Sequence, residues 1–314
     1  MDIIREALNG LRLGESKTVA GLTVFPLLSG ETGGNGAPDY IPLEEALEAG
    51  VARVTEVSES GTVPELHFTN DGERPVLLVD GAALIGAKQN RVLNLSILAP
   101  GQKTIVIPVS CSESGRWHRR SAAFSTADHL MYASGKARKM AQVSSALKAS
   151  RGSVRRSDQA AVWGDIEAKM FRLSTKSPSS EMNEMYRKYE ERLRVISEAF
   201  VAEDGQVGLL LGLNGDPVGV EVFDRPQALR TYLPKILRSY GLEALELTPD
   251  QNKTLSRQAA EGFVSQVAEA ETKSYDAVGL GKDLRLEGRT VAGGALVVDG
   301  GVVHLTAFQM AQLQ

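Results

Sequence analysis

The sequence predicts an α+β fold with a β-rich N-terminal half, a helical middle and a mixed α/β C-terminal segment. Short runs of β-branched and apolar residues between turn signals dominate residues 1–124. Apolar residues at helical spacing dominate residues 125–204, and the two patterns alternate over residues 205–314. Because closely spaced strands favour antiparallel pairing, we expect the first region to be mostly antiparallel and sandwich-like. The length of 314 residues suggests one large domain or two ordinary ones.

The first region is expected to open with a short amphipathic helix, because Ile3, Ile4 and Leu8 fall on one side of a helical turn. The stretch "PLEEALEAG" predicts a second short helix, with Pro42 at its start and Gly50 after its end. Strands are predicted where β-branched and apolar residues are concentrated, at 18–28, 51–57, 63–69, 76–79, 91–98 and 104–110.

The middle region predicts three helices and one basic loop. The first helix is expected over 125–150, with Ser125 or Thr126 as its N-cap. The second and third are expected within 157–173 and 179–205. Between the first two helices, the small and basic residues of "RGSVRRS" predict a mobile loop.

The last region predicts two hairpins and two helices. Asn214 and Gly215 supply the positive φ angles that a tight turn between two strands requires, and Asp299-Gly300 marks a second such turn. Helices are expected over 226–240 and 249–273.

Composition argues against several classes of protein and of site. The N-terminus has no apolar stretch that resembles a signal peptide, and no run is long enough for a membrane span, so we expect a cytoplasmic protein without membrane contact. Cys111 is the only cysteine, which excludes an intramolecular disulfide. Four scattered histidines without metal-ligand spacing predict neither a metal nor another cofactor. The sequence does not specify an oligomeric state.

Charge is unevenly distributed along the chain. Residues 86–160 contain 13 Lys and Arg against three acidic residues, a net charge of +10, while the rest of the chain carries -14. Such asymmetry favours an anionic ligand near the middle of the chain. It is equally consistent with acidic segments that fold back against the basic one.

Cys111 begins the motif "CSESGR", which places four residues between Cys and Arg, whereas the phosphate-binding loop of a cysteine phosphatase needs five. In a strand, Cys111 shares a face with Ile105, Ile107 and Val109. This alternation favours a small apolar core residue over a nucleophile.

A polar row is predicted on the strand over 91–98. If this stretch is extended, its leucines and Ile97 point one way, while Asn94 and Ser96 point the other and Asn90 continues their row. Beside Lys88 and Arg91, these groups could donate several hydrogen bonds to an anion or a sugar. The alternative is a solvated sheet face.

The stretch "GRWHRR" adds three arginines and an aromatic ring to the same region. Trp117 could stack on a nucleotide base, although a tryptophan after a strand also serves in packing.

The stretches "GAKQNRVLNLSIL", "IPVSCSESGRW" and "GGALVVDGGVVHLTAF" resemble the ARG-and-rhodanese-phosphatase-superfamily-associated protein domain family, over about residue 15 to the C-terminus. The resemblance implies a single family domain and a role around NAD-derived or ADP-ribosylated molecules. The positions that match the family's signature are Lys88, Gln89, Asn90, Arg91, Cys111, Glu113, Arg116 and Trp117. Ala82 and Ala83 depart from it, because acidic residues often precede the first motif. Asp80 and Glu113 remain as the nearby carboxylates.

These observations lead us to expect recognition or processing of a phosphorylated nucleotide-type ligand, such as ADP-ribose or another NAD-derived molecule. Glu113 is the expected proton carrier. The expected ligand contacts are Lys88, Arg91 and Arg116 to phosphate, Gln89, Asn90 and Asn94 to sugar or base, and Trp117 to the base. The alternative is a non-catalytic RNA- or protein-binding module that uses the basic segment 86–160.

Overall fold

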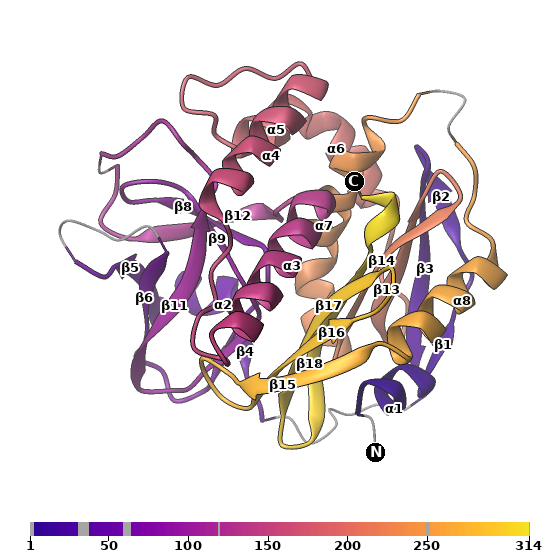
Figure 1. Cartoon of the computed structure of the whole chain (residues 1–314), viewed down its shortest axis with the longest axis horizontal. Coiled ribbons are helices and arrows are strands. Elements are labelled where there is room, and N and C mark those ends of the chain that lie inside the picture. Colours follow the sequence, from indigo (N-terminus) through magenta and orange to yellow (C-terminus); the bar gives the residue numbers. More distant parts are fainter. Residues whose placement is uncertain (1–2, 31–37, 59–63, 119, 249–251, 314) are drawn as a thin grey trace.

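The computed structural model describes residues 3–30, 38–58, 64–118, 120–248 and 252–313. It places a β-barrel and a large twisted sheet side by side, with helices between them and above them (Figure 1). The predicted α+β class is confirmed, with most strands of the N-terminal half ahead of the helical middle.

The large sheet joins the two ends of the chain. Its order is β1-β3-β13-β14-β18-β17-β16-β15, with β2 beside β3, and every ladder in it is antiparallel. Both predicted hairpins are confirmed, since Asn214, Gly215, Asp299 and Gly300 all have positive φ angles. The strands are β1 (Leu11–Leu13), β2 (Lys17–Val19), β3 (Leu22–Ser29), β13 (Gln206–Leu213), β14 (Asp216–Phe223), β15 (Glu271–Asp276), β16 (Lys282–Glu287), β17 (Val291–Val298) and β18 (Gly301–Gln309).

Six of the N-terminal strands after β3 form a closed barrel rather than the stacked sheets of a sandwich. Its order is β11-β6-β5-β12-β8-β9. The barrel closes because β11 is long enough to pair with two partners, β6 along its first part and β9 at its end. The strands are β5 (Ala52–Glu56), β6 (Glu65–Asn70), β8 (Ala82–Gly86), β9 (Arg91–Leu93), β11 (Lys103–Cys111) and β12 (Phe124–Leu130). A three-stranded sheet beside the barrel has the order β10-β7-β4, from β4 (Ile41–Pro42), β7 (Val76–Leu78) and β10 (Ile97–Ala99).

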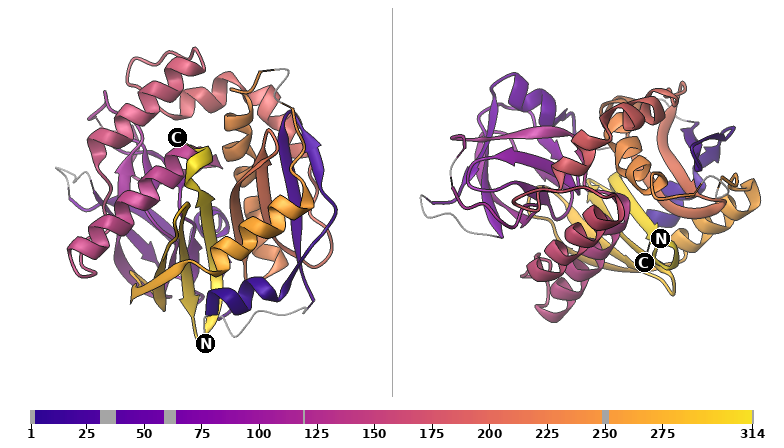
Figure 2. Two further views of the ribbon diagram at one scale, coloured as in Figure 1. Left: turned by 45° about the vertical axis from the view of Figure 1, so that its right-hand side comes forward. Right: turned by 90° about the horizontal axis from the view of Figure 1, so that it is seen from above.

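Helices cover both faces of the large sheet. The left view of Figure 2 shows α1 and α8 along its outer face, where they share an apolar cluster with the sheet. On the inner face, α3 and α7 lie between the sheet and the barrel (Figure 1). The helices are α1 (Ile3–Asn9), α2 (Leu43–Glu48), α3 (Ala133–Ala149), α4 (Gln159–Arg172), α5 (Asn183–Lys188), α6 (Glu190–Glu198), α7 (Pro226–Ala244) and α8 (Arg257–Ala268). None of these, within the ranges given above, combines the length and the apolar composition that crossing a membrane requires.

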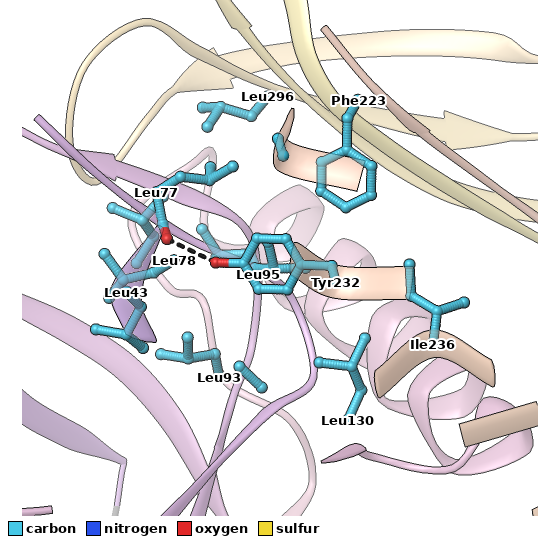
Figure 3. Close-up of a cluster of buried hydrophobic side chains, with 14 of the residues drawn as sticks. Leu43, Leu77, Leu78, Leu93, Leu95, Leu130, Phe223, Tyr232, Ile236 and Leu296 are labelled. Atoms are coloured by element: carbon cyan, nitrogen blue, oxygen red, sulfur yellow. Dashed lines mark hydrogen bonds between the residues drawn. The ribbon is translucent and has the colours of Figure 1, made fainter. Parts of the chain in front are cut away.

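One apolar core connects barrel, small sheet and large sheet. Tyr232 of α7 lies at its centre and donates a hydrogen bond from its hydroxyl to the carbonyl oxygen of Leu77, at 3.0 Å (Figure 3). Leu93 of the barrel and Leu296 of the large sheet belong to the same buried cluster. The buried hydroxyl is thus satisfied, and α7 packs against all three β-structures at once.

Three predicted helices differ in the structure, and the one expected within 179–205 is two helices, α5 and α6, which meet at Tyr189. The stretch from Ser125 to Leu130 is strand β12 rather than the first turns of a helix, because it completes the barrel between β5 and β8. The chain becomes helical only at Ala133. The helix predicted over 249–273 runs from Arg257 to Ala268 and is followed by β15; residues 249–251 lie outside the described ranges.

The strand predicted over 91–98 is two strands. The chain leaves the barrel after β9 and enters the small sheet at β10, so Asn94 and Ser96 lie in the crossing between them. The basic loop predicted to be mobile packs against this crossing. The Asn94 side chain donates to the carbonyl oxygen of Arg155 at 3.0 Å, and the hydroxyls of Ser110 and Ser157 are 2.6 Å apart.

Candidate functional site

Register brings the two predicted signature stretches together at one end of the barrel. Arg91 begins β9 and pairs directly with Cys111 at the end of β11. The residues just before Arg91 therefore lie beside the residues just after Cys111. We call these two loops, residues 86–91 and 111–118, the barrel-end loops.

An ion pair between Glu113 and Arg116 lies at the centre of the barrel-end loops. Arg116 Nη2 is 2.8 Å from Glu113 Oε2, and the two side chains are 2% and 0% exposed. Arg116 also donates to the carbonyl oxygens of Ala87 and His118, at 2.8 and 3.0 Å, and to Asn90 Oδ1 at 3.1 Å. Protein acceptors therefore occupy the N–H groups of the Arg116 guanidinium, and these hydrogen bonds fix the shape of both loops.

Glu113 is surrounded by donors. Its carboxylate accepts from Arg116, from the Ser179 hydroxyl at 2.8 Å and from the Asn90 backbone N–H at 3.2 Å. Burial alone would raise the pKa of Glu113, but these hydrogen bonds and the Arg116 charge outweigh it and lower the pKa. Glu113 is therefore an ionised anchor for the loops, and it holds no proton to give at neutral pH.

The amide side chains of the predicted site also bind protein groups. Asn90 donates to Glu181 Oε1 at 2.7 Å, and Gln89 donates to the carbonyl oxygen of Glu113. Asn94 lies apart from them, where its Oδ1 accepts from the Ser110 hydroxyl at 2.6 Å.

Arg91 has N–H groups without hydrogen-bond partners among the described residues. Its side chain is fully buried, and Nη1 donates to the Gln89 carbonyl oxygen at 2.9 Å, whereas Nε and Nη2 have no hydrogen-bond partner among the described residues. The Arg91 guanidinium and Lys88 Nζ lie 5.7 and 5.6 Å from the centre of the Trp117 ring. Trp117 itself is 48% exposed. The end of the barrel thus presents an accessible indole next to two cationic side chains.

Cys111 is fully buried, as the strand alternation predicts. Burial raises the pKa of its thiol to about 11, although the Arg91 charge acts in the opposite direction. The thiolate that a nucleophile needs is scarce at neutral pH.

We therefore expect Cys111 to react slowly with iodoacetamide in the native protein and quickly after unfolding in urea. Intact-mass spectrometry over time measures both rates on the wild-type chain, with the unfolded sample as the control. Native alkylation as fast as that of the unfolded chain would contradict the burial of this thiol.

A second group of charged side chains is buried under α3 and was not predicted, apart from Asp80. Lys136 and Lys139, one helical turn apart, face the core from α3. Lys136 Nζ is 2.7 Å from Glu221 Oε1 of β14, and Lys139 Nζ is bound to Asp80 Oδ1. Arg285 of β16 contacts the neighbouring Asp283 at 2.8 Å, and further members are His304 and Ser96. We call this set the α3-covered network.

Strand alternation explains the place of the network. Glu221, His304, Thr306 and Arg285 share the inner face of the large sheet, while their neighbours in sequence face α1 and α8. A small cavity of about 10 Å³ lies within the network, lined by Asp80, Leu95, Ser96, Met140, Asp283, Arg285, Gly294, Ala295, Leu296 and Thr306. That volume is enough for about one water molecule.

A ligand-sized cavity of about 380 Å³ lies elsewhere, between α3, α4, α7 and the β13–β14 hairpin. Its lining includes Arg138, Arg172, Glu243 and Glu246. Each of these side chains is already engaged in an ion pair, so the cavity shows no preference for a ligand of one charge.

The basic segment 86–160 is partly neutralised within the fold. Several of its cations form ion pairs with acidic side chains, which belong to the segment or to other parts of the chain. These pairs are Arg116–Glu113, Lys136–Glu221, Arg138–Asp165, Lys139–Asp80 and Lys148–Glu287. Three of these cations are buried. Within the described ranges, moreover, no group of three or more His, Cys, Asp or Glu side chains is arranged to hold a metal ion.

Comparison with protein families gives one match. The family model described as the ARG and Rhodanese-Phosphatase-superfamily-associated Protein domain matches residues 10–308. Neither the curated proteins nor the solved structures include one that matches the chain.

Proposed function

Because the chain belongs to the family of ARG and Rhodanese-Phosphatase-superfamily-associated Protein domains, we propose that it binds a phosphorylated nucleotide-type ligand such as ADP-ribose. The family description associates the domain with ARG and rhodanese-phosphatase superfamily proteins, and the resemblance described above implies a role around NAD-derived or ADP-ribosylated molecules. The ligand site in this proposal is the end of the barrel, at the barrel-end loops.

The observation that carries the proposal is the unsatisfied guanidinium of Arg91. A buried cation with two unpaired N–H-bearing nitrogens is costly, and an anionic ligand would supply the missing acceptors. The Lys88 ammonium lies over the Trp117 ring, as the Arg91 guanidinium does, and would also contact the phosphate. Trp117, nearly half exposed, offers a face on which a base could stack.

The other predicted residues receive different roles in this proposal. Arg116, Gln89 and Asn90 hold the barrel-end loops in shape through their bonds to Glu113. Glu113 is an ionised carboxylate saturated with donors, which favours recognition of the ligand over proton transfer to it.

The RNA-binding alternative is less well supported. A polyanion needs many exposed cations, and the fold pairs or buries a number of those in the basic segment. RNA binding would show a steep fall of affinity with salt, whereas a single nucleotide contacts few phosphates and gives a shallow dependence.

We expect ADP-ribose to bind with a saturable isotherm in calorimetric titration of the wild-type protein. Trp117→Ala removes the stacking face and should weaken binding by about 1–3 kcal/mol, roughly 5- to 150-fold in Kd. Lys88→Ala should also weaken it. Lys103→Ala is the matched control, because Lys103 is an exposed lysine at the opposite end of β11 and makes the same change of charge.

Two results would contradict the proposal. One is the absence of saturable binding by ADP-ribose and by AMP. The other is an equal loss in Lys88→Ala and Lys103→Ala, which would indicate diffuse electrostatic attraction of the kind that polyanions show.

A further inference from the structure

Ser96, His304 and Glu221 form a continuous chain of polar contacts within the α3-covered network. The Ser96 hydroxyl oxygen is 2.8 Å from His304 Nδ1. On the other side of the ring, His304 Nε2 is 3.3 Å from Glu221 Oε2. The imidazole is held between them by the Phe223 ring, whose centre lies 4.6 Å away. A hydroxyl, an imidazole and a carboxylate in this order are the parts of a nucleophilic triad, which is recognised by geometry rather than by position in the sequence.

A neighbouring backbone donor fixes the direction of the hydrogen bond between Ser96 and His304. The backbone N–H of Asp80 donates to the Ser96 oxygen at 2.9 Å, so the Ser96 hydrogen is free to point at His304 Nδ1. Nδ1 accepts this hydrogen when the ring hydrogen is on Nε2; that nitrogen lies 3.3 Å from Glu221 Oε2, and neither atom has a hydrogen-bond partner among the described residues. Glu221 stays ionised, because Lys136 Nζ lies 2.7 Å from its other oxygen. This is the protonation state in which His304 can take the Ser96 proton.

Ser96 also has neighbours suited to a developing negative charge. It is partly exposed and lines the same small cavity as Arg285 and Thr306. Arg285 is 2% exposed, and its Nε and Nη1 find no hydrogen-bond partner in the described part of the chain, nor does the Thr306 hydroxyl. Gly294 makes room for the guanidinium, since a Cβ there would lie 3.1 Å from Arg285 Nη1. Unused donors beside a nucleophile are what an oxyanion requires.

We propose that Ser96 is the nucleophile of an acyl-transfer site, with His304 as its base, Glu221 as the carboxylate whose charge favours the protonated form of His304, and Arg285 as the oxyanion donor. The substrate class is a carboxylic ester with a small acyl group, because the cavity beside Ser96 has room for about one water molecule. Met140 also lines the cavity, and its flexible side chain can yield to an acetyl group. This site is separate from the ligand site proposed at the end of the barrel.

The reaction balances with water as the only co-reactant. Ser96 Oγ forms a bond to the ester carbonyl carbon, its proton passes to His304 Nδ1, and the carbonyl oxygen becomes an oxyanion beside Arg285. The oxyanion collapses, the bond to the leaving alcohol breaks, and that alcohol takes the proton from His304. Water then attacks the acylated Ser96 and gives a proton to His304, which returns it to the Ser96 oxygen as the carboxylic acid leaves.

The test uses p-nitrophenyl acetate with the full chain. We expect release of p-nitrophenol and, after rapid quenching, a mass increase of one acetyl group that peptide mapping places on Ser96. Ser96→Ala should abolish that modification, and His304→Gln should slow it by about 100-fold or more, the usual contribution of a general base. Ser125→Ala, at an exposed serine of β12, is the matched control and should behave like the wild type.

If a variant does not fold, the wild-type protein still tests the proposal. Phenylmethylsulfonyl fluoride should label Ser96 and stop the release of p-nitrophenol. Acetylation confined to lysines would overturn the proposal. So would an unchanged rate in a folded Ser96→Ala variant, equal labelling of Ser96 in His304→Gln, or no labelling of Ser96 by either reagent.

Discussion

Glu113→Ala is expected to destabilise the fold by about 3–5 kcal/mol, the usual cost of removing one partner from a buried ion pair. The substitution leaves the Arg116 guanidinium buried without its counter-charge, and it removes the acceptor of Ser179 and of the Asn90 backbone. Urea unfolding followed by circular dichroism measures the loss as a lower midpoint at an unchanged slope.

The control is Glu191→Ala, the same substitution at an exposed member of a surface ion pair with Arg194. It should leave the unfolding midpoint nearly unchanged, because solvent screens such pairs. A loss below about 1 kcal/mol in Glu113→Ala, the range of exposed pairs, would show that the barrel-end loops do not depend on this carboxylate.

The same pair predicts a dependence on pH. The folded pKa of Glu113 lies below its unfolded value of about 4.3, so the stability that it contributes is complete above that pH and is lost as the pH falls through the folded pKa. The difference in stability between wild type and Glu113→Gln should therefore be constant near neutrality and shrink in acid. A difference that grows in acid would reverse the sign and contradict the assignment.

Lys136→Met is the second substitution with a large expected effect, again about 3–5 kcal/mol of unfolding free energy. Lys136 and Glu221 are each 1% exposed, and removal of the ammonium leaves the carboxylate buried beside His304 without its counter-charge. Methionine fills a similar volume, so the loss reports the charge rather than a cavity.

A double-mutant cycle separates the pair from its surroundings. Lys136→Met combined with Glu221→Gln removes both charges, and we expect the double variant to be more stable than the sum of the two single losses implies. Additive losses would mean that the two side chains do not interact, contrary to their 2.7 Å contact.

The sequence predicted the elements better than their arrangement. Period-two alternation and turn residues located most strands and both hairpins, because these signals are local. Barrel closure depends instead on the end of β11 reaching β9, and nothing within either strand indicates that partner. Ser125 and Thr126 have the residue types of a helix cap, yet pairing with β8 made them strand.

In the candidate sites, too, the sequence indicated which residues lie close together better than it indicated which charges pair. The signature motifs located the barrel-end loops. They did not indicate that Arg116 would form an ion pair with Glu113, or that Arg91 would keep N–H groups without partners among the described residues. In β14 and β18, a polar residue alternates with apolar ones at Glu221 and His304, a pattern typical of a solvated face. That face is buried because α3 covers it, and the lysines of α3 supply the opposite charge. The sequence feature that could have indicated this burial is the presence of Lys136 and Lys139 on the apolar side of α3.

The order in which the large sheet is assembled sets a constraint on synthesis. A ribosome releases β3 early, yet β13, its partner on one edge, begins about 180 residues later at Gln206. The barrel, by contrast, has all its ladders within residues 52–130. A nascent chain can therefore pair the barrel strands while the apolar edge of β3 still awaits a partner. That interval exposes the chain to wrong strand pairing, and it is the stage at which a chaperone would matter most.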